Sequence, residues 1–363
     1  MFKSVISHFF LLNSIMIFYT GSYTQEGAPA IDPIGKGIGC FQFNTETGQI
    51  VPLHYTKQGN PSYVAISENK KYLYAVEEMF EELDPQIYAY CIGDNGQLTL
   101  LNSQKLIGDY ACHITITQQQ LVVANYVSGN VIVYPISDDG SLGEIKQIIQ
   151  HKGKGPNVER QEAAHAHMVY PFDSDKLFVV DLGLDKAVCY QMNDSLQWVA
   201  IPKYNIKIEA GAGARHMVMS ANEQFAYILS ELKGELFVAQ KDDKGFSITQ
   251  KLSFVPKGYT GIFGGAAIRI HPSGKFIFTS CRGTDSISVF KVNEENGKLS
   301  LAGHYGSAGK TPRDFNIDPS GQWLIVANQD SNSLAVFKID SDTGKLSNTA
   351  SYDVETPVNI SWL

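Results

Sequence analysis

The stretch DFNIDPSGQWLIVANQDSNSLAVFKIDSDTGKLSNTA, residues 314–350, decides the fold. It begins with a short strand pattern, passes a polar D-P-S-G turn and continues into the apolar run WLIVAN. After a second polar turn, alternating residues flank a D-T-G turn, which is the pattern of a β-hairpin. Four short strands in a unit of about 45–50 residues are typical of one blade of a β-propeller.

The same unit recurs along the chain. Clear copies are CHITITQQQLVVANY, AHMVYPFDSDKLFVVDL and RHMVMSANEQFAYILSE. With the first residue of the inner strand as reference, the seven copies start at Tyr63, His113, His167, His216, Ala267, Asp314 and Asn359. Their intervals of 45 to 54 residues predict seven blades around a channel. Strand patterns dominate throughout, which disfavours α/β folds.

The two ends of the chain complete each other. The seventh inner strand, at Asn359, leaves no room for three more strands before Leu363, and the first apolar strand, IMIFYTGSY (15–23), has no inner strand before it. We therefore expect an all-β, seven-bladed β-propeller with four antiparallel strands per blade, its last blade closed by the N- and C-terminal strands. Residues 15–363 would form this single domain, and residues 1–14 an N-terminal extension.

Charge and cysteine content disfavour several classes of protein. A net charge of −8 without long basic runs argues against binding to nucleic acid. The cysteines number five and have no C-x-x-C spacing, which disfavours a disulfide framework or a zinc knuckle. The apolar stretch near the N-terminus is interrupted by polar residues, and no later stretch is long enough to span a bilayer. We therefore expect a cytoplasmic protein, with export through the N-terminal segment as the alternative.

If every blade has the same fold, polar residues that do not recur at equivalent positions are candidates for function. The start of the inner strand, the residue before it and the residue after the second strand should all face one mouth of the channel. These positions give His113, His167, Arg215, His216, Glu231, Arg282 and Arg313. A charged cluster in a concave site is costly to desolvate unless it is paired or used on a ligand. We expect these side chains to meet in one pocket.

Simpler interpretations stay open for single members of this set. A histidine at a strand end is often only a hydrogen-bonding residue, and Glu231 with Arg282 also fits an ion pair between blades. The spacing of His165 and His167 suits a metal ion, but no third and fourth ligands are evident. The stretch GKGIG (35–39) is not followed by a helix, which favours a loop over a phosphate site.

The ordered set of motifs resembles a known family, the seven-bladed propeller lactonases, which groups the propeller type of 6-phosphogluconolactonase with fungal carboxymuconate cyclases. The resemblance is carried by YTGSYT (19–24), NPSYVAIS (60–67), HAHMV (165–169), GARHMVMS (213–220), LSELKGEL (229–236), CRGTDSISVF (281–290) and TPRDFNIDPSGQWLIVANQDSNSLAVF (311–337). It covers nearly everything after residue 14. The catalytic set proposed for that family falls on His167, Arg215, Glu231 and Arg282.

The resemblance implies an esterase for a sugar lactone, with 6-phosphogluconolactone as the leading candidate. His167, titrating near neutrality, would be the general base, and no metal or other cofactor is expected. Arginines would clamp the anionic group and stabilise the oxyanion, with His113, His216 and Arg313 as further substrate contacts. The expected partner is a small sugar lactone.

Three other functions remain open. A muconate-type lactonising cyclase would use the same groups, and a non-catalytic propeller would present its rim to a protein. A calcium-dependent gluconolactonase would use residues such as Asn125, Asp181 and Asn328.

Overall fold

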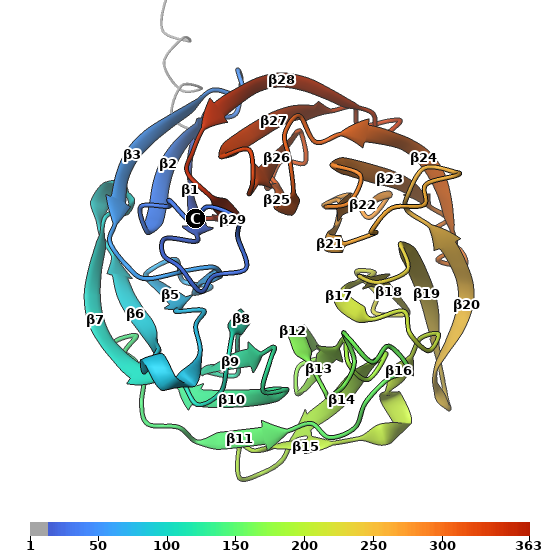
Figure 1. Ribbon diagram of the computed structural model, residues 1–363, viewed down its shortest axis with the longest axis horizontal. Helices are drawn as coiled ribbons and strands as arrows, with labels where there is room; N and C mark the ends of the chain where they lie inside the picture. Colours follow the sequence, from blue (N-terminus) through green and yellow to red (C-terminus); the bar gives the residue numbers. More distant parts are fainter. Residues whose placement is uncertain (1–13) are drawn as a thin grey trace, which may run out of the picture.

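The computed structural model describes residues 14–363 as a ring of seven β-sheets around a central channel (Figure 1). Each sheet runs from an inner strand at the channel to an outer strand at the rim, and neighbouring strands are antiparallel. The predicted seven-bladed, all-β fold is confirmed. Residues 1–13, nearly all of the expected N-terminal extension, lie outside the described residues, so the domain boundary at residue 14 stays a prediction.

The strands are given in chain order of the blades, from inner to outer strand. Blades one and two contain β4 (Val64–Ile66), β5 (Tyr72–Val76), β6 (Gln86–Ile92), β7 (Leu98–Lys105), β8 (Ala111–Thr117), β9 (Gln120–Asn125), β10 (Asn130–Pro135) and β11 (Gln147–Gln150). Blades three and four contain β12 (Ala166–Phe172), β13 (Lys176–Asp181), β14 (Lys186–Met192), β15 (Trp198–Ala200), β16 (Ile206–Lys207), β17 (Ala214–Met219), β18 (Phe225–Ser230), β19 (Glu235–Asp242) and β20 (Gly245–Ser253).

Blades five and six contain β21 (Gly265–Ile270), β22 (Phe276–Cys281), β23 (Ser286–Val292), β24 (Leu299–Gly306), β25 (Pro312–Ile317), β26 (Trp323–Asn328), β27 (Ser333–Ile339) and β28 (Leu346–Asp353). Blade seven contains β29 (Pro357–Trp362), β1 (Ile15–Ser22), β2 (Ile38–Asn44) and β3 (Ile50–Thr56). The helical segments within residues 14–363 are short 3-10 turns at Glu81–Leu83, Asp94–Gly96 and Pro202–Tyr204. None of these described helices has the length and apolar character needed to cross a lipid bilayer.

Blade seven joins both ends of the chain. β29 pairs with β1 in antiparallel register, with Asn359 opposite Gly21 and Trp362 opposite Phe18. The Trp362 ring packs against those of Phe18 and Phe43, with centroid distances of 5.2 and 5.3 Å. The predicted closure of the ring is confirmed, because β29 gives β1 a hydrogen-bonded neighbour on its channel side.

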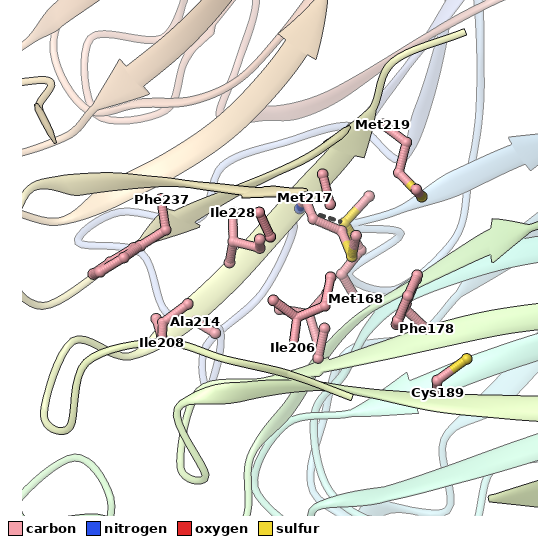
Figure 2. Close-up of a cluster of buried hydrophobic side chains, with 14 of the residues drawn as sticks. Met168, Phe178, Cys189, Ile206, Ile208, Ala214, Met217, Met219, Ile228 and Phe237 are labelled. Atoms are coloured by element: carbon pink, nitrogen blue, oxygen red, sulfur yellow. Dashed lines mark hydrogen bonds between the residues drawn. The ribbon is translucent and has the colours of Figure 1, made fainter. Parts of the chain in front are cut away.

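The apolar middle strands form the core between neighbouring blades. All six residues of β22 and of β26 are buried, whereas outer strand β28 has mostly exposed residues. Figure 2 shows one such cluster, in which Met168 and Phe178 of blade three pack against Met217, Ile228 and Phe237 of blade four. The faces of the blades are thus filled by apolar side chains. The polar side chains at the starts of the inner strands are directed to the channel instead.

A bulge near the start of the inner strand turns one extra side chain toward the channel. It lies between Ala111 and His113, Ala166 and Met168, Ala214 and His216, and Pro312 and Asp314. The inserted residues are Cys112, His167, Arg215 and Arg313, and all four line one small cavity. Bulges commonly redirect side chains next to active sites.

This register corrects one alignment made from the sequence. The overlay of the repeats puts His167 in the same position as His216, but the structure puts Met168 there. Met168 lies opposite Val180 as His216 lies opposite Leu229. The β12–β13 hairpin is one residue shorter than the β17–β18 hairpin, so that matching the HMV letters of both strands shifts blade three by one position. His167 is therefore the structural counterpart of Arg215.

The position that Met168 occupies links adjacent blades. Its side chain accepts a hydrogen bond from a backbone N–H of the next inner strand. The pairs are Met168 Sδ with Met217 N–H at 3.2 Å (Figure 2), His113 Nδ1 with Val169 N–H at 3.4 Å, Asp314 Oδ2 with Ile360 N–H at 3.2 Å, and Asn359 Oδ1 with Val64 N–H at 3.2 Å. The shared bond supports the register and gives His113 a structural partner.

Candidate active site

A cavity of about 900 Å³ opens at the end of the channel where the second strands of the blades end. Its charged lining includes Glu231, which follows β18, Arg282, which follows β22, and Arg313 of β25. Arg160 joins them from the connection between β11 and β12. A volume of this size is typical of sites for small molecules. We call it the outer cavity.

Glu231 is the centre of the charged cluster. Its Oε2 accepts a hydrogen bond from Nε of Arg215 and forms an ion pair with Nη2 of Arg282, each at 3.0 Å. Its Oε1 accepts one from Nη2 of Arg160 at 2.6 Å. Glu231 and Arg282 thus form the inter-blade ion pair that the sequence also allows. Three guanidinium groups on one carboxylate leave two positive charges in excess, which suits the binding of an anion.

Glu231 and Arg215 keep their charges at neutral pH. Burial raises the pKa of Glu231, but the guanidinium groups of Arg282, Arg215 and Arg160 outweigh it and hold this pKa far below its ordinary value. Burial and the charge of Arg282 lower the pKa of Arg215 to about 10, although Glu231 acts in the opposite direction. Electrostatic interactions at such buried groups are stronger than in water.

A second cavity, of about 20 Å³, lies in the channel and admits about one water molecule. His167 and Arg215 line this inner cavity, and Arg313 lines both cavities. The set expected in one pocket is therefore divided, because Glu231 and Arg282 line the outer cavity. The ion pair between Arg215 and Glu231 connects the two groups of residues.

His167 is buried beside Cys112 and Tyr126. Its Nδ1 lies 3.7 Å from the Sγ of Cys112, and its ring meets the ring of Tyr126 edge-on at a centroid distance of 5.3 Å. Burial and the charge of Arg215 lower the pKa of His167 well below its ordinary value, with Glu231 opposing them. The imidazole is therefore neutral at pH 7, as a base requires, and its titration lies below the neutral range expected from the sequence.

The other residues predicted to bind substrate lie at different depths. His216 lines the inner cavity, with its ring 5.3 Å from that of His167. Its Nδ1 has no hydrogen-bond partner among the described residues. His113 packs against Tyr63 at a ring distance of 4.3 Å and lines neither cavity. Of these predicted contacts, Arg313 is the one that reaches the outer cavity.

His165 and His167 have separate surroundings. His165 donates from Nδ1 to the carbonyl oxygen of Tyr126 at 2.9 Å, and its Nε2 lies 3.2 Å from a carboxylate oxygen of Glu162. His165 thus anchors the connection before β12, whereas His167 faces the inner cavity. Within residues 14–363, no group of three or more His, Cys, Asp and Glu side chains has an arrangement suited to a metal ion.

The candidate calcium ligands support loops of three different blades. Asn125 donates to the carbonyl oxygen of Ile107 at 3.1 Å, Asn328 to that of Ser307 at 3.0 Å, and Asp181 accepts from the backbone N–H groups of His165 and Leu184 at 2.9 and 3.0 Å.

Comparison with known protein families matches residues 17–362 to the family described as "Lactonase, 7-bladed beta-propeller". The chain belongs to this family. Proteins named 6-phosphogluconolactonase from Bacillus subtilis and Formosa agariphila are 35% and 34% identical to it over 309 residues, which are 83% of this chain and 84% and 86% of theirs. The solved structure of the periplasmic gluconolactonase of Pseudomonas aeruginosa has a TM-score of 0.88 and 26% identity, covering 96% of this chain and 99% of that one.

The sequence did not single out two residues of this lactonase's cluster, Tyr126 and Arg160. The hydroxyl of Tyr126 accepts a hydrogen bond from Nη2 of Arg160 at 3.1 Å. Tyr126 follows the second strand of blade two, as Glu231 does in blade four, but it carries no charge. Arg160 lies in the longest connection between an outer and an inner strand within residues 14–363. The length of this connection could have indicated Arg160 from the sequence, because long irregular connections often carry functional residues.

Proposed function

We propose that this lactonase hydrolyses 6-phosphogluconolactone to 6-phosphogluconate. The observation that carries the proposal is the set of three guanidinium groups around the Glu231 carboxylate, at the wall of a cavity of about 900 Å³. In a protein with a net charge of −8, an anionic substrate needs such a local positive site. The two relatives named 6-phosphogluconolactonase support the same substrate.

Lactone hydrolysis needs an activated water, a donor to the oxyanion and a path for one proton. In the proposed mechanism, the water molecule that the inner cavity admits adds to the carbonyl carbon of a lactone bound in the outer cavity, while neutral His167 accepts its proton. Arg215, which shares the inner cavity with His167, donates to the oxyanion. The ester C–O bond then breaks, the ring oxygen takes the proton from His167, and the open-chain acid leaves.

The remaining residues have supporting roles in this proposal. Arg282 lines the outer cavity with a partly exposed side chain and clamps the anionic group of the substrate. Glu231 orients and balances the arginines and does not attack the substrate. Arg313 and His216 contact the lactone near the inner cavity, and His113 takes part through its ring contact with His216.

The assay that tests the function uses purified protein with 6-phosphogluconolactone and glucono-δ-lactone, in buffer containing a chelator. We expect acid release from the phosphorylated lactone that the chelator does not reduce. Activity only after addition of calcium would argue against the mechanism above. Consumption of cis,cis-muconate without lactone hydrolysis would favour the cyclase, and inactivity on all three compounds would favour a binding module.

We infer that the enzyme works in the cytoplasm. Its five cysteines are unpaired, which fits a reducing compartment, and Pseudomonas aeruginosa supplies the contrasting case of a neighbour described as periplasmic. Cell fractionation with N-terminal sequencing would decide between the locations. Mature protein in the periplasm without residues 1–14 would contradict this inference.

A further inference from the structure

The three arginines around Glu231 are not equally tied to the protein. Arg215 is buried, with a side chain 4% exposed, and also donates from Nη1 to the carbonyl oxygen of Ala266. Arg282 is 22% exposed and donates from Nε to the carbonyl oxygen of Gly264 at 3.2 Å. Arg160 is 43% exposed, the most of the three. Arg160 is therefore the guanidinium that solvent or a ligand in the outer cavity reaches most readily.

The contacts of Arg160 are also the easiest to exchange. Its guanidinium hydrogen bonds, both from Nη2, go to the side chains of Glu231 and Tyr126, at 2.6 and 3.1 Å. It bonds to Oε1 of Glu231, whereas Arg215 and Arg282 share Oε2. If Arg160 turns away, Glu231 keeps two guanidinium partners. The carboxylate is then still compensated, and the movement leaves no unpaired buried charge.

The backbone around Arg160 is fixed, so that the side chain is the part free to move. Gln161 is fully buried and donates from Nε2 to the carbonyl oxygen of Leu182 and to Oδ1 of Asp185, both at 2.8 Å. Asn157 accepts from the backbone N–H of Arg160 through its Oδ1 at 3.2 Å. These bonds hold the Arg160 backbone beside the outer cavity.

We propose that Arg160 joins Arg282 in holding the phosphate and thereby distinguishes the phosphorylated lactone from the unphosphorylated one. Its guanidinium exchanges Oε1 of Glu231 for the phosphate of the substrate, to which it can bind with two parallel hydrogen bonds. The excess of two positive charges around Glu231 matches the charge of about −2 on a phosphate monoester. Glu159 and Asp330 also line the outer cavity, together with Arg313, so that the match is one of the Glu231 cluster and not of the whole lining.

This inference rests on the proposed lactonase function, so the experiment separates the two. Steady-state kinetics of the wild type, Arg160→Gln and Arg160→Lys are measured on 6-phosphogluconolactone and glucono-δ-lactone. Lys154→Gln, which removes a charge from the same connection at an exposed position, is the matched control. Thermal melts confirm that each variant folds.

For Arg160→Gln we expect a rise of about 10- to 100-fold in KM for the phosphorylated lactone, as for loss of hydrogen bonds to a charged group. The KM for glucono-δ-lactone should change much less, and Arg160→Lys should recover part of the loss. An equal loss on both lactones, or none on either, would overturn the role of Arg160. A wild type without preference for the phosphorylated lactone would overturn it too, while leaving the lactonase function intact.

Isothermal titration with the two product acids, 6-phosphogluconate and gluconate, gives a readout that does not depend on catalysis. Arg160→Gln should weaken binding of 6-phosphogluconate by the same factor and leave binding of gluconate nearly unchanged. If the wild type hydrolyses neither lactone but shows this difference in binding, the proposed hydrolysis is wrong and the role of Arg160 in phosphate recognition stands. Equal binding of 6-phosphogluconate by both proteins would overturn that role.

Discussion

The two ends of the inner strands differ in how far their residues and bonds recur from blade to blade. At the end away from the outer cavity, one backbone bond recurs in four blades: the N–H groups of Ser67, Ser220, His271 and Asp318 donate to the carbonyl oxygens of Tyr72, Phe225, Phe276 and Trp323. In two of these turns a serine side chain adds the same bond, since Phe225 N–H donates to Ser220 Oγ and Tyr72 N–H to Ser67 Oγ, both at 3.0 Å. At the cavity end, the residue near the end of the second strand whose N–H donates to the connection before the inner strand differs in nearly every blade: Glu78, Tyr126, Leu182, Glu231, Arg282, Gln329 and, in blade seven, Tyr23. Residues that the fold requires recur from blade to blade, whereas residues of the candidate site do not.

Deletion of residues 359–363 should have the largest effect, because it removes a part that every blade needs. It eliminates most of β29, leaves β1 with an open edge and removes the Trp362 ring from its contacts with Phe18 and Phe43. We expect loss of the cooperative thermal transition, measured by circular dichroism. Deletion of Leu363 alone is the control and should leave a cooperative transition. A normal transition after the longer deletion would contradict closure by the termini.

Glu231→Gln changes a residue at the cavity end of the inner strands, where blades differ, and should have the next largest effect on stability. Without the carboxylate, three guanidinium groups face one another around a neutral amide. Breaking a buried ion pair of this kind costs about 3–5 kcal/mol in the free energy of unfolding, measured by denaturant titration at pH 7. Glu209→Gln is the matched control, because Glu209 also pairs with two cations, Lys233 and Lys251, but on the surface. That change should have little effect.

The stability difference between wild type and Glu231→Gln should depend on pH. The folded protein holds the pKa of Glu231 below its ordinary value of 4.5, so that the ionised group stabilises the fold fully above that pH. As the pH falls through 4.5 toward the lowered pKa, this contribution is lost, and the difference between the two proteins should shrink. A difference that stays constant between pH 7 and pH 3 would show that the carboxyl is not held ionised by its arginines.

His167→Ala should reduce kcat by about 10²–10⁴-fold with little change in KM, if this residue is the general base. Because its pKa is lowered, the wild-type kcat should be constant across neutral pH and fall only at acid pH, where the imidazole takes up a proton. The variant should lack that acid limb. His54→Ala, in outer strand β3, is the control and should keep the wild-type kcat. A wild-type kcat in His167→Ala would end the assignment.

The fold could be predicted from the sequence because blade formation depends on features that recur. Alternating residues, D-G and T-G turns and the buried second strands give the same pattern several times, so that an irregular copy is still recognised. The missing strands at the two ends then require closure through Asn359 and Gly21. The register of blade three was the exception. One residue fewer in a hairpin moved His167 to the bulge, and the shared letters HMV concealed the difference.

The candidate site was predictable only where its residues lie on regular strands. His167, Arg215, Glu231 and Arg282 all lie at or next to strand ends, and their positions follow from the repeat. Arg160 reaches Glu231 from an irregular connection whose path depends on the buried side chain of Gln161, which no repeat pattern specifies. The division into two cavities also depends on how side chains fill the channel. For these reasons, the sequence predicted one pocket and omitted Arg160.

The smallest effect is expected from changes in the turns at the end of the inner strands away from the outer cavity. Ser220→Ala and Ser67→Ala remove the same bonds from equivalent turns, since each serine accepts from a backbone N–H and donates to an asparagine Oδ1, of Asn222 or Asn69, at 2.7 Å. Each should lower the free energy of unfolding by about 1 kcal/mol, with kcat and KM unchanged.

The informative quantity is the difference between the two serine variants. If the turns are interchangeable parts of one repeat, both variants should lose stability equally, within about 0.5 kcal/mol, in parallel denaturant titrations. A clearly larger loss in one of them would show that blades also differ at the end away from the outer cavity. A fall in kcat in either variant would connect that end to catalysis and remove the contrast between the two ends of the propeller.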